Sequence, residues 1–234
     1  MISSAKRCDN VEKFFGEIVT TTSTDRIRQK KQRFLEREQL IKDTTLSLLI
    51  RDGVEKVTVS AIATKAGIGK GTVYKHFQSK AEIMMRIVSD YEQMLVSNVN
   101  AGIKATENGD PGAAAKAYFD SRLANPALDR LVQQLEFRLE ADESVATEMA
   151  SLHKIRHGMV ETLNNMVSKL IERGLLEDVP PHYHYLACWA LAQGAVDVCF
   201  NQGFADQFDD KEKLLNFIAN IGVTMGNRGQ FREH

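Results

Sequence analysis

One stretch of this chain decides how the rest is interpreted. It runs from Asp52 to Ile83 and reads DGVEKVTVSAIATKAGIGKGTVYKHFQSKAEI. We expect two short helices joined by a tight turn at Gly67 and Gly69, because glycine adopts positive φ angles at little cost. The second short helix carries the cationic, hydroxyl and ring side chains that bind phosphates and base edges of DNA, namely Lys70, Thr72, Tyr74, Lys75 and His76.

Helical periodicity surrounds this stretch on both sides. From about Lys31 to Arg51 the apolar residues fall near one helical face, and Ser79 with Glu82 forms a capping box that opens a long helix through about Ile103. Glycine, proline and polar breaks then separate five further helical stretches, at about 113–124, 127–140, 144–173, 181–203 and 211–225. The sequence shows no β alternation, so it predicts an all-α protein.

The charge of the chain is divided unevenly along its length. Residues 26–80 hold 13 Lys and Arg against 5 Asp and Glu, a net charge of +8, whereas residues 81–234 hold 14 against 22, a net charge of −8. This division is typical of a module that binds a polyanion, attached to a remainder that does not. We therefore expect a basic N-terminal extension at 1–32, a helix-turn-helix domain at 33–80 and a larger helical-bundle domain at 81–234.

Composition argues against several other classes of protein. No stretch approaches the roughly 20 apolar residues that span a bilayer, and the N-terminus lacks the pattern of a secretory signal. Three cysteines, Cys8, Cys188 and Cys199, are too few and too scattered for a disulfide framework or a four-ligand zinc site. We expect a cytoplasmic, nucleoid-associated protein with no cofactor.

At this point a family resemblance is visible. The spaced pattern Thr58-x-x-x-Ile62-Ala63-x-x-Ala66-Gly67-Ile68-x-x-Gly71-Thr72-Val73-Tyr74-x-His76-Phe77-x-x-Lys80 resembles the DNA-binding signature of the tetracycline-repressor (TetR) family. The match covers about 50 residues, from Phe34 to Ile83, within the expected helical frame. Two positions depart from the pattern: Gly69 stands where a serine or threonine cap is common, and Ala81 where an acidic residue is frequent. The second short helix, which we call the recognition helix, is therefore expected to start with a weaker N-cap than a serine or threonine would give.

The resemblance implies roles for individual residues. By position in the motif, Thr58 and Ser60 would contact phosphates, Tyr74 and Lys80 would clamp the DNA backbone, and Gly71 would allow close approach. By the same resemblance, Lys70, Thr72 and Lys75 would face the major groove. His76 also lies on the expected outward face of the helix. Two alternatives stay open: Tyr74 as a core aromatic, and His76 as a capping or packing residue.

The resemblance also implies a homodimer that binds a palindromic operator in double-stranded DNA, usually as a repressor, and a small-molecule effector bound by the C-terminal domain. We expect dimerisation through the last two helices, which carry small and apolar residues: Ala187, Ala190, Gly194, Leu214, Phe217, Ile218 and Ile221. Methionines and aromatic residues suit an adaptable pocket for an apolar or amphipathic effector: Met94, Tyr118, Phe119, Phe137, Met159 and Met166.

Some residues outside the motif permit other interpretations of the chain. His153, His157 and Glu161 share a helical face with metal-compatible spacing, although we expect no metal because no further ligand is evident. Cys188 and Cys199 could pair only across a dimer axis. A nucleoid or division-associated DNA-binding factor without an effector is the alternative function. An all-α enzyme is disfavoured, because we find no nucleophile–base pair, phosphate loop or carboxylate–histidine helix motif.

Overall fold

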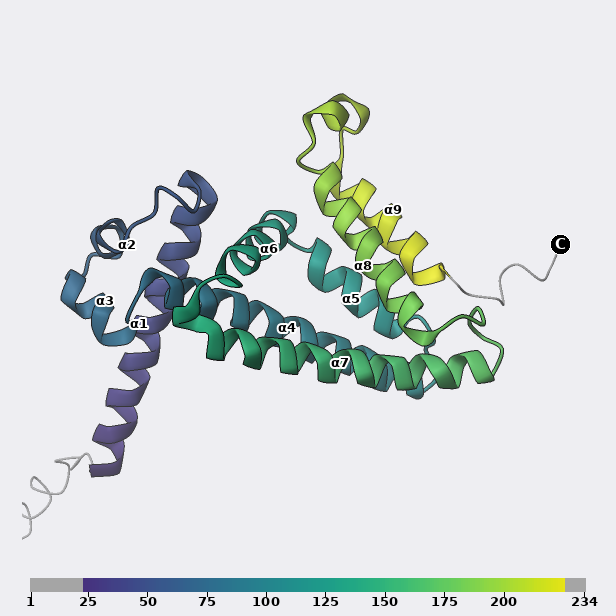
Figure 1. Cartoon of the computed structure of the whole chain (residues 1–234), viewed down its shortest axis with the longest axis horizontal. Coiled ribbons are helices and arrows are strands. Elements are labelled where there is room, and N and C mark those ends of the chain that lie inside the picture. Colours follow the sequence, from purple (N-terminus) through teal and green to yellow (C-terminus); the bar gives the residue numbers. More distant parts are fainter. Residues whose placement is uncertain (1–22, 226–234) are drawn as a thin grey trace, which may run out of the picture. The chain divides into compact units, whose positions relative to one another are not determined.

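The computed structural model of the chain describes residues 23–225. All regular elements of this range are helical (Figure 1). The α-helices are α1 (Ser23–Asp52), α2 (Val59–Lys65), α3 (Lys70–His76), α4 (Lys80–Glu107), α5 (Ala113–Leu123), α6 (Pro126–Leu139), α7 (Ala146–Glu172), α8 (Pro181–Val198) and α9 (Lys211–Thr224). Two short 3-10 helices, η1 (Glu143–Val145) and η2 (Gln202–Gln207), lie between them. The predicted all-α class is confirmed.

The chain divides into two units, residues 1–40 and 41–234, and α1 crosses the boundary. In the first unit, the described part of α1 exposes nearly all its side chains, including those of the basic residues Arg26, Arg28, Lys30, Lys31 and Arg33. This helix begins at Ser23, eight residues before the expected start near Lys31, because Arg, Lys and Gln are good helix formers even without an apolar period. Residues 1–22 of the predicted extension, with Cys8, lie outside the described range.

Within the second unit, local sequence signals set the boundaries of the first helices. Gly53, with φ of 82°, follows the end of α1, and Gly67, with φ of 65°, forms the turn after α2. The Ser79 hydroxyl accepts a hydrogen bond from the Glu82 amide at 3.1 Å, as a capping box requires. The carboxylate of Glu82 accepts from the amide of Gln78 at 2.5 Å, one residue before the cap, rather than from Ser79 itself.

One hydrophobic cluster joins the first helices of this unit to α6 and α7. It contains Ile62, Val73 and Phe77 from the helix-turn-helix, and Leu135 and Met149 from the later helices, all at most 5% exposed. Two ion pairs add to these contacts: Lys42 of α1 pairs with Asp90 of α4, and Arg138 of α6 pairs with Glu55 in the loop before α2. The helix-turn-helix therefore shares one hydrophobic cluster with α4, α6 and α7.

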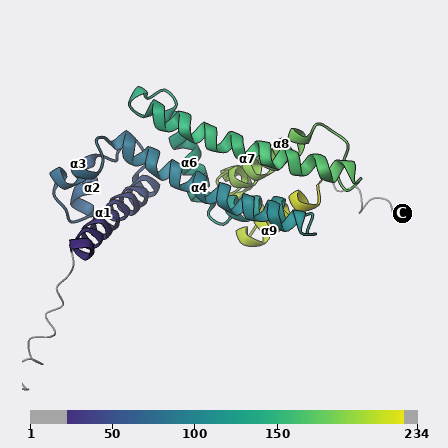
Figure 2. The same cartoon turned by 90° about the horizontal axis from the view of Figure 1, so that it is seen from below.

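A second hydrophobic cluster is formed by α4, α5, α7, α8 and α9. The long helices α4 and α7 run side by side (Figure 2). Helix α5 packs closely on α4. Gly102 permits this approach, since a Cβ there would lie 2.7 Å from the carbonyl oxygen of Ala113. Helix α8 ends at Val198, earlier than the expected Gly203, because the chain turns at Cys199–Asn201 into η2. The domain divisions at 32/33 and 80/81 remain predictions.

Candidate nucleic-acid interface

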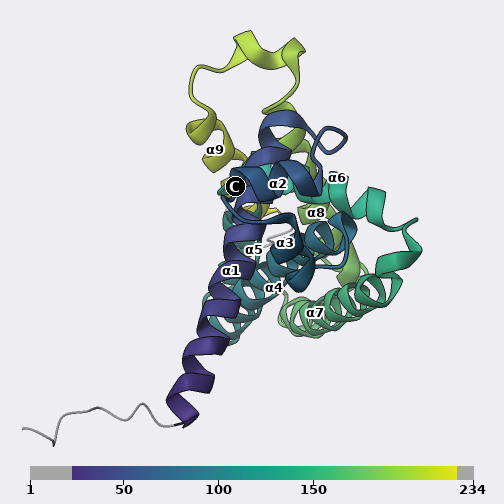
Figure 3. The ribbon, with the colours of Figure 1, turned by 90° about the vertical axis from the view of Figure 1, so that its left-hand side faces the viewer.

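The helix-turn-helix is held together from inside. The amide of Ile68 in the turn donates to the carbonyl oxygen of Ala63 in α2 at 3.0 Å. Val73 of α3 and its C-cap residue Phe77 are 0% and 1% exposed, as their spacing of four residues predicts. These two residues fix the inner face of α3, whereas Lys70, Tyr74 and Lys75 are exposed. Figure 3 views the molecule with α2 and α3 toward the reader.

The structure places the predicted DNA-contacting residues on or near this outer surface. Thr58, Ser60, Lys70, Gly71, Tyr74 and Lys75 are exposed, whereas Thr72, His76 and Lys80 are half-buried. Tyr74 is 47% exposed, which excludes the alternative of a core aromatic. The ammonium nitrogen of Lys70 lies 5.9 Å from the centre of the Tyr74 ring, within cation–π range. Lys70 and Tyr74 thus form one exposed cationic and aromatic patch on α3.

The caps of the two helices differ as their sequences indicate. The Thr58 hydroxyl oxygen accepts from the Ala61 amide at 3.2 Å and so caps α2. Its hydroxyl proton remains available as a donor to an acceptor such as a phosphate oxygen. Gly69 gives α3 no side-chain cap, in agreement with the expected weaker start of this helix.

Lys80 has a role that the sequence did not reveal. Its ammonium group donates to the backbone carbonyl oxygens of Val54 at 2.9 Å and Val57 at 3.0 Å. Burial lowers the pKa of this ammonium, and the neighbouring Arg138 adds to the effect. Two of its three donors are therefore committed to the loop before α2, which leaves one for a DNA phosphate. Lys80 positions the helix-turn-helix, whatever it contributes to DNA.

Farther along the chain, an apolar cavity of about 280 Å³ lies among α5, α7, α8 and α9. Of the predicted pocket residues, Tyr118 and Met166 line it. Phe119 and Met159 are buried in the second hydrophobic cluster, and Met94 and Phe137 are 38% and 80% exposed. The cavity therefore lies farther toward the C-terminus than the methionine distribution suggested.

The first half of α8 supplies pocket residues that the sequence interpretation missed. Tyr183, His184, Tyr185 and Cys188 line the apolar cavity, together with Ala187, which we had assigned to the dimer interface. Burial raises the pKa of the Cys188 thiol to about 11 and also raises the pKa of the Tyr118 hydroxyl. The run of aromatic and histidine residues after Pro180-Pro181 was the available signal, since such residues commonly line ligand pockets.

The other predicted dimer residues divide into two groups. Ala190, Gly194, Phe217 and Ile221 are exposed, and Leu214 and Ile218 are half-buried. A Cβ at Gly194 would meet nothing within 4 Å. Both described cysteines are free, and Cys199 is buried while Cys188 faces the cavity. This burial disfavours the alternative of a disulfide across a dimer axis.

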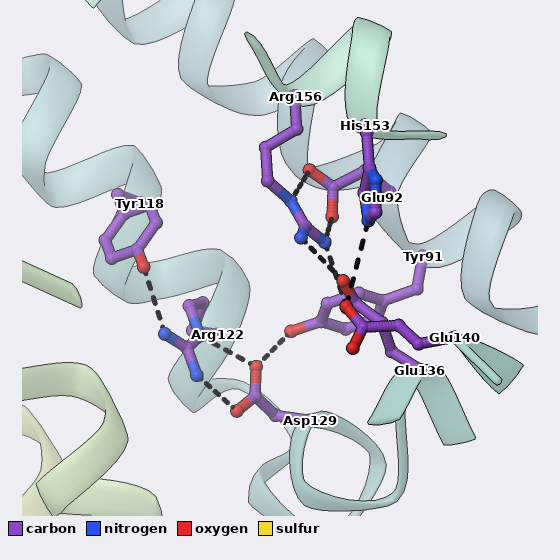
Figure 4. A network of polar contacts seen from close by, with 9 residues as sticks. All are labelled: Tyr91, Glu92, Tyr118, Arg122, Asp129, Glu136, Glu140, His153 and Arg156. Carbon is purple, nitrogen blue, oxygen red and sulfur yellow. Dashed lines mark hydrogen bonds and ion pairs between the residues drawn. The ribbon is translucent and has the colours of Figure 1, made fainter. Parts of the chain in front are cut away.

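Polar side chains of α4, α5, α6 and α7 form a partly buried network (Figure 4). Arg122 pairs with Asp129, and Arg156 pairs with both Glu92 and Glu136. In the described part of the chain, the residues grouped closely enough for a metal are Glu136, Glu140 and His153. His157 and Glu161, whose spacing is compatible with a metal, are not in that group, and Arg156 already donates hydrogen bonds to the Glu136 carboxylate. Across residues 23–225, no helix is long and apolar enough to cross a membrane.

Comparisons with known proteins agree with this geometry. Residues 41–87 match the family model described as bacterial regulatory proteins, tetR family. The nucleoid occlusion factor SlmA of Actinobacillus pleuropneumoniae is 26% identical over 157 residues, 65% of this chain and 76% of that protein. The fatty acid metabolism regulator protein of Bacillus subtilis is 23% identical over 154 residues, 65% of this chain and 75% of that protein.

Solved structures share the fold. The ketosteroid transcriptional regulator KstR2 of Mycobacterium tuberculosis superposes with a TM-score of 0.63 at 16% identity, over 82% of this chain and 95% of that one. The fatty acid degradation regulator FadR of Bacillus halodurans gives a TM-score of 0.56 at 18% identity, over 84% of this chain and 97% of that one.

Proposed function

The chain belongs to the tetR family of bacterial regulatory proteins, and on this premise we propose that it is a homodimeric repressor released from a palindromic operator by a small apolar or amphipathic effector. The family and the fold are those of transcriptional regulators rather than enzymes. One observation carries the proposal: α3 presents Lys70, Tyr74 and Lys75 to solvent while Val73 and Phe77 lock its inner face. Such a helix can enter a major groove without disturbing its own packing.

Exposed apolar residues on α8 and α9 support the dimer. Leu186, Phe217 and Ile221 are 51%, 62% and 43% exposed, and the exposed Ala190 and Gly194 allow another helix to approach closely. Exposed large apolar side chains on two helices that pack together support a protein–protein interface there. One short recognition helix binds a single half-site only weakly. Two copies joined here would present two recognition helices to the two half-sites of one operator.

The apolar cavity supports an effector. Its lining of Ala114, Tyr118, Met166, Leu170 and Cys188 combines aliphatic, aromatic and thiol groups with few charges, which suits an apolar or amphipathic molecule. The second candidate function is a nucleoid-associated DNA-binding factor without an effector. The similarity to nucleoid occlusion factors over 157 residues favours this candidate, whereas the cavity favours the ligand-responsive regulator.

A selection experiment tests DNA binding first. The purified full chain is used to select duplexes from a random library, and binding of the enriched operator is measured by fluorescence anisotropy. Tyr74→Ala and Lys70→Ala should weaken this binding, Lys70→Ala by about 1–3 kcal/mol if it contacts a base. Lys154→Ala is the matched control, because it removes an exposed cation from α7. No enrichment, or equal effects of the three substitutions, would contradict the proposal.

A second experiment separates the two candidate functions. Small apolar compounds are screened by thermal shift, and those that stabilise the protein are tested for release of the operator. A regulator of the proposed kind should lose operator affinity on binding such a compound. If compounds fill the cavity without any change in operator affinity, the effector-free candidate becomes the better account.

A further inference from the structure

A second cavity, of about 280 Å³, lies among α4, α5, α6, α7 and α8 and differs in chemistry from the first. We call it the polar cavity. Its lining includes the buried ion pairs of Figure 4 as well as Phe137 and Trp189. Tyr118 and Tyr185 line both cavities, and their ring centres are 6.0 Å apart with the planes at 72°. The two tyrosines are therefore part of the lining that the two cavities share.

The charges that line the polar cavity do not balance. Four carboxylates are present, those of Glu92, Asp129, Glu136 and Glu140, against the two guanidinium groups of Arg122 and Arg156. Arg122 is matched by Asp129, with two hydrogen bonds of 2.8 Å. The remaining lining holds one guanidinium and three carboxylates, so the cavity has a net charge of −2.

Part of this excess negative charge lies beside Arg156, whose single positive charge pairs with two carboxylates. It donates to Glu92 at 3.1 and 2.8 Å and to Glu136 at 2.6 and 3.0 Å. The side chains of Glu92 and Glu136 are only 5% and 16% exposed. A partly buried negative charge without its own counter-ion is unfavourable, and a bound cation would relieve it.

Glu140 contributes the second carboxylate in excess of the guanidinium groups. It lines the same cavity and is 54% exposed, with its carboxylate 4.0 Å from His153 Nε2. Glu136 is in the last turn of α6 and Glu140 is its C-cap, where the partial negative charge of the helix end disfavours carboxylates. Glu136 and Glu140 therefore do not stabilise the C-terminal end of α6, and their presence there needs another explanation.

Aromatic rings surround these carboxylates. Phe137 is 80% exposed and Trp189 47% exposed, yet both line the polar cavity. Tyr91, Tyr118 and Tyr185 complete the aromatic lining. Aromatic faces attract organic cations through their quadrupole, most strongly when carboxylates lie nearby and water is displaced. Rings combined with a negative surplus are the chemistry that recognises an ammonium group.

We propose that the effector is an amphipathic organic cation, with its ammonium head in the polar cavity and its hydrocarbon body directed past Tyr118 and Tyr185 into the apolar cavity. The inference rests on the proposed effector function and adds the chemical class of the ligand. The head is recognised by Glu136, Glu140 and the ring of Trp189. A neutral or anionic head group on the same hydrocarbon body binds less well, because it leaves the surplus negative charge unrelieved.

Three probes with the same ten-carbon chain test this proposal: decyltrimethylammonium, decanol and decanoate. Trp189 is the only tryptophan of the chain, so its emission reports on the polar cavity directly. The expected result is a dissociation constant at least tenfold lower for decyltrimethylammonium than for decanol, with a change in Trp189 emission. Decanoate should bind most weakly, and tetramethylammonium, which lacks the hydrocarbon body, should bind less tightly than the decyl cation.

Two matched variants test the site itself. Glu140→Gln removes a 54% exposed carboxylate and should weaken decyltrimethylammonium binding at least fivefold while leaving decanol unchanged. Glu161→Gln makes the same change at an exposed position of α7 outside the polar cavity and should change neither. Equal affinities for the three decyl compounds, no binding of any of them, or equal effects of the two variants would overturn the proposal.

The outcomes for ligand class and for regulation are distinguishable. If decanol and the decyl cation release the operator equally well, the proposed function stands and the head-group inference fails. If the full chain selects no operator from random duplexes, the proposed function fails, whereas the affinities of the three probes still decide which head group the polar cavity prefers.

Discussion

Arg122 and Asp129 form a two-pronged ion pair in the interior, with Arg122 Nε and Nη2 each 2.8 Å from a different oxygen of Asp129. The two side chains are 4% and 1% exposed. Asp129 also accepts hydrogen bonds from the Tyr91 hydroxyl at 2.5 Å and the Gln133 amide at 2.6 Å. Burial opposes the charge on Arg122, but the hydrogen bonds from it to Asp129 raise the pKa of its guanidinium. The ion pair joins α5 to α6, and the Tyr91 hydroxyl links it to α4.

Breaking this pair on one side should destabilise the protein strongly. Asp129→Ala leaves the Arg122 charge buried without its partner, so we expect a loss of about 3–5 kcal/mol in urea unfolding. The double variant Arg122→Met/Asp129→Leu should recover much of that loss, because an apolar pair leaves no buried charge. The control is Asp120→Ala, which breaks an exposed pair with Lys116 and should cost about 0.5 kcal/mol or less. Equal losses for Asp129→Ala and Asp120→Ala would show that the buried pair contributes nothing special.

The helices themselves were largely predictable from the sequence. Caps and breakers such as Gly53, Ser79 and Gly174 are local features, and the structure places helix ends beside each of them. The inner face of α3 followed from the spacing of Val73 and Phe77. These signals act within one helical turn, which is why a single sequence reveals them.

The site was less predictable because its contacts are long-range. Lys80 binds carbonyl oxygens 26 and 23 residues away, and Arg156 pairs with Glu92 across 64 residues. No periodicity encodes such partners. The apolar cavity was predicted only in part for the same reason. The predicted Tyr118 and Met166 line it, whereas the rest of its lining includes the aromatic start of α8, a helix whose small residues indicated only a dimer contact.

Lys80 binds the loop before α2 and is also predicted to contact DNA, so its substitution should test folding and DNA binding separately. Lys80→Met keeps the aliphatic stem but removes the donor to Val54 and Val57, so the protein should lose about 1–3 kcal/mol of stability. Lys75→Ala should leave the melting temperature unchanged, because the structure shows an exposed side chain. Lys75→Ala should also reduce the salt dependence of operator binding by about one unit of slope if Lys75 contacts a phosphate.

The salt dependence of operator binding by Lys80→Met shows whether Lys80 also contacts a DNA phosphate. A reduction by about one unit, measured well below the melting temperature, would show that its third donor reaches a phosphate. A stability loss with an unchanged slope would confine Lys80 to its positioning role. An unchanged stability would contradict the two hydrogen bonds to the loop.

Gly102 should be intolerant of a side chain although it lies within a helix. A Cβ there would meet the Ala113 carbonyl oxygen at 2.7 Å and the Ala114 Cα at 2.9 Å, both backbone atoms that cannot move aside. Gly102→Ala should therefore destabilise the protein by about 1–3 kcal/mol. Gly158→Ala is the matched control in α7, where a Cβ meets nothing within 4 Å, and it should stabilise by up to about 1 kcal/mol. The same sign for both substitutions in thermal unfolding would contradict the close packing of α4 and α5.

The proposed dimer predicts a single-residue disruption. Phe217 is 62% exposed on α9, so Phe217→Glu should leave the folded chain intact while it opposes association by placing charge in an apolar interface. Light scattering should then give the mass of one chain, 26.2 kDa, and affinity for a two-half-site operator should fall about a hundredfold. Ile155→Glu, on α7 and 40% exposed, is the control and should leave the mass of the wild type unchanged. A wild-type mass of one chain would contradict the dimer itself.

The thiol of Cys188 offers a chemical report on the apolar cavity. Burial raises its pKa to about 11, and the thiolate is the form that reacts with alkylating reagents. In a Cys8→Ser/Cys199→Ser background, the rate of alkylation should therefore rise about tenfold for each pH unit between 7 and 10, and level off near 11. In urea, where burial is lost, the same rate should level off near the ordinary thiol pKa of about 8.5. Decanol should slow alkylation of the folded protein by occupying the cavity beside the sulfur. A folded-state rate that levels off near the ordinary value, or that decanol leaves unchanged, would place Cys188 in contact with solvent rather than in the wall of the cavity.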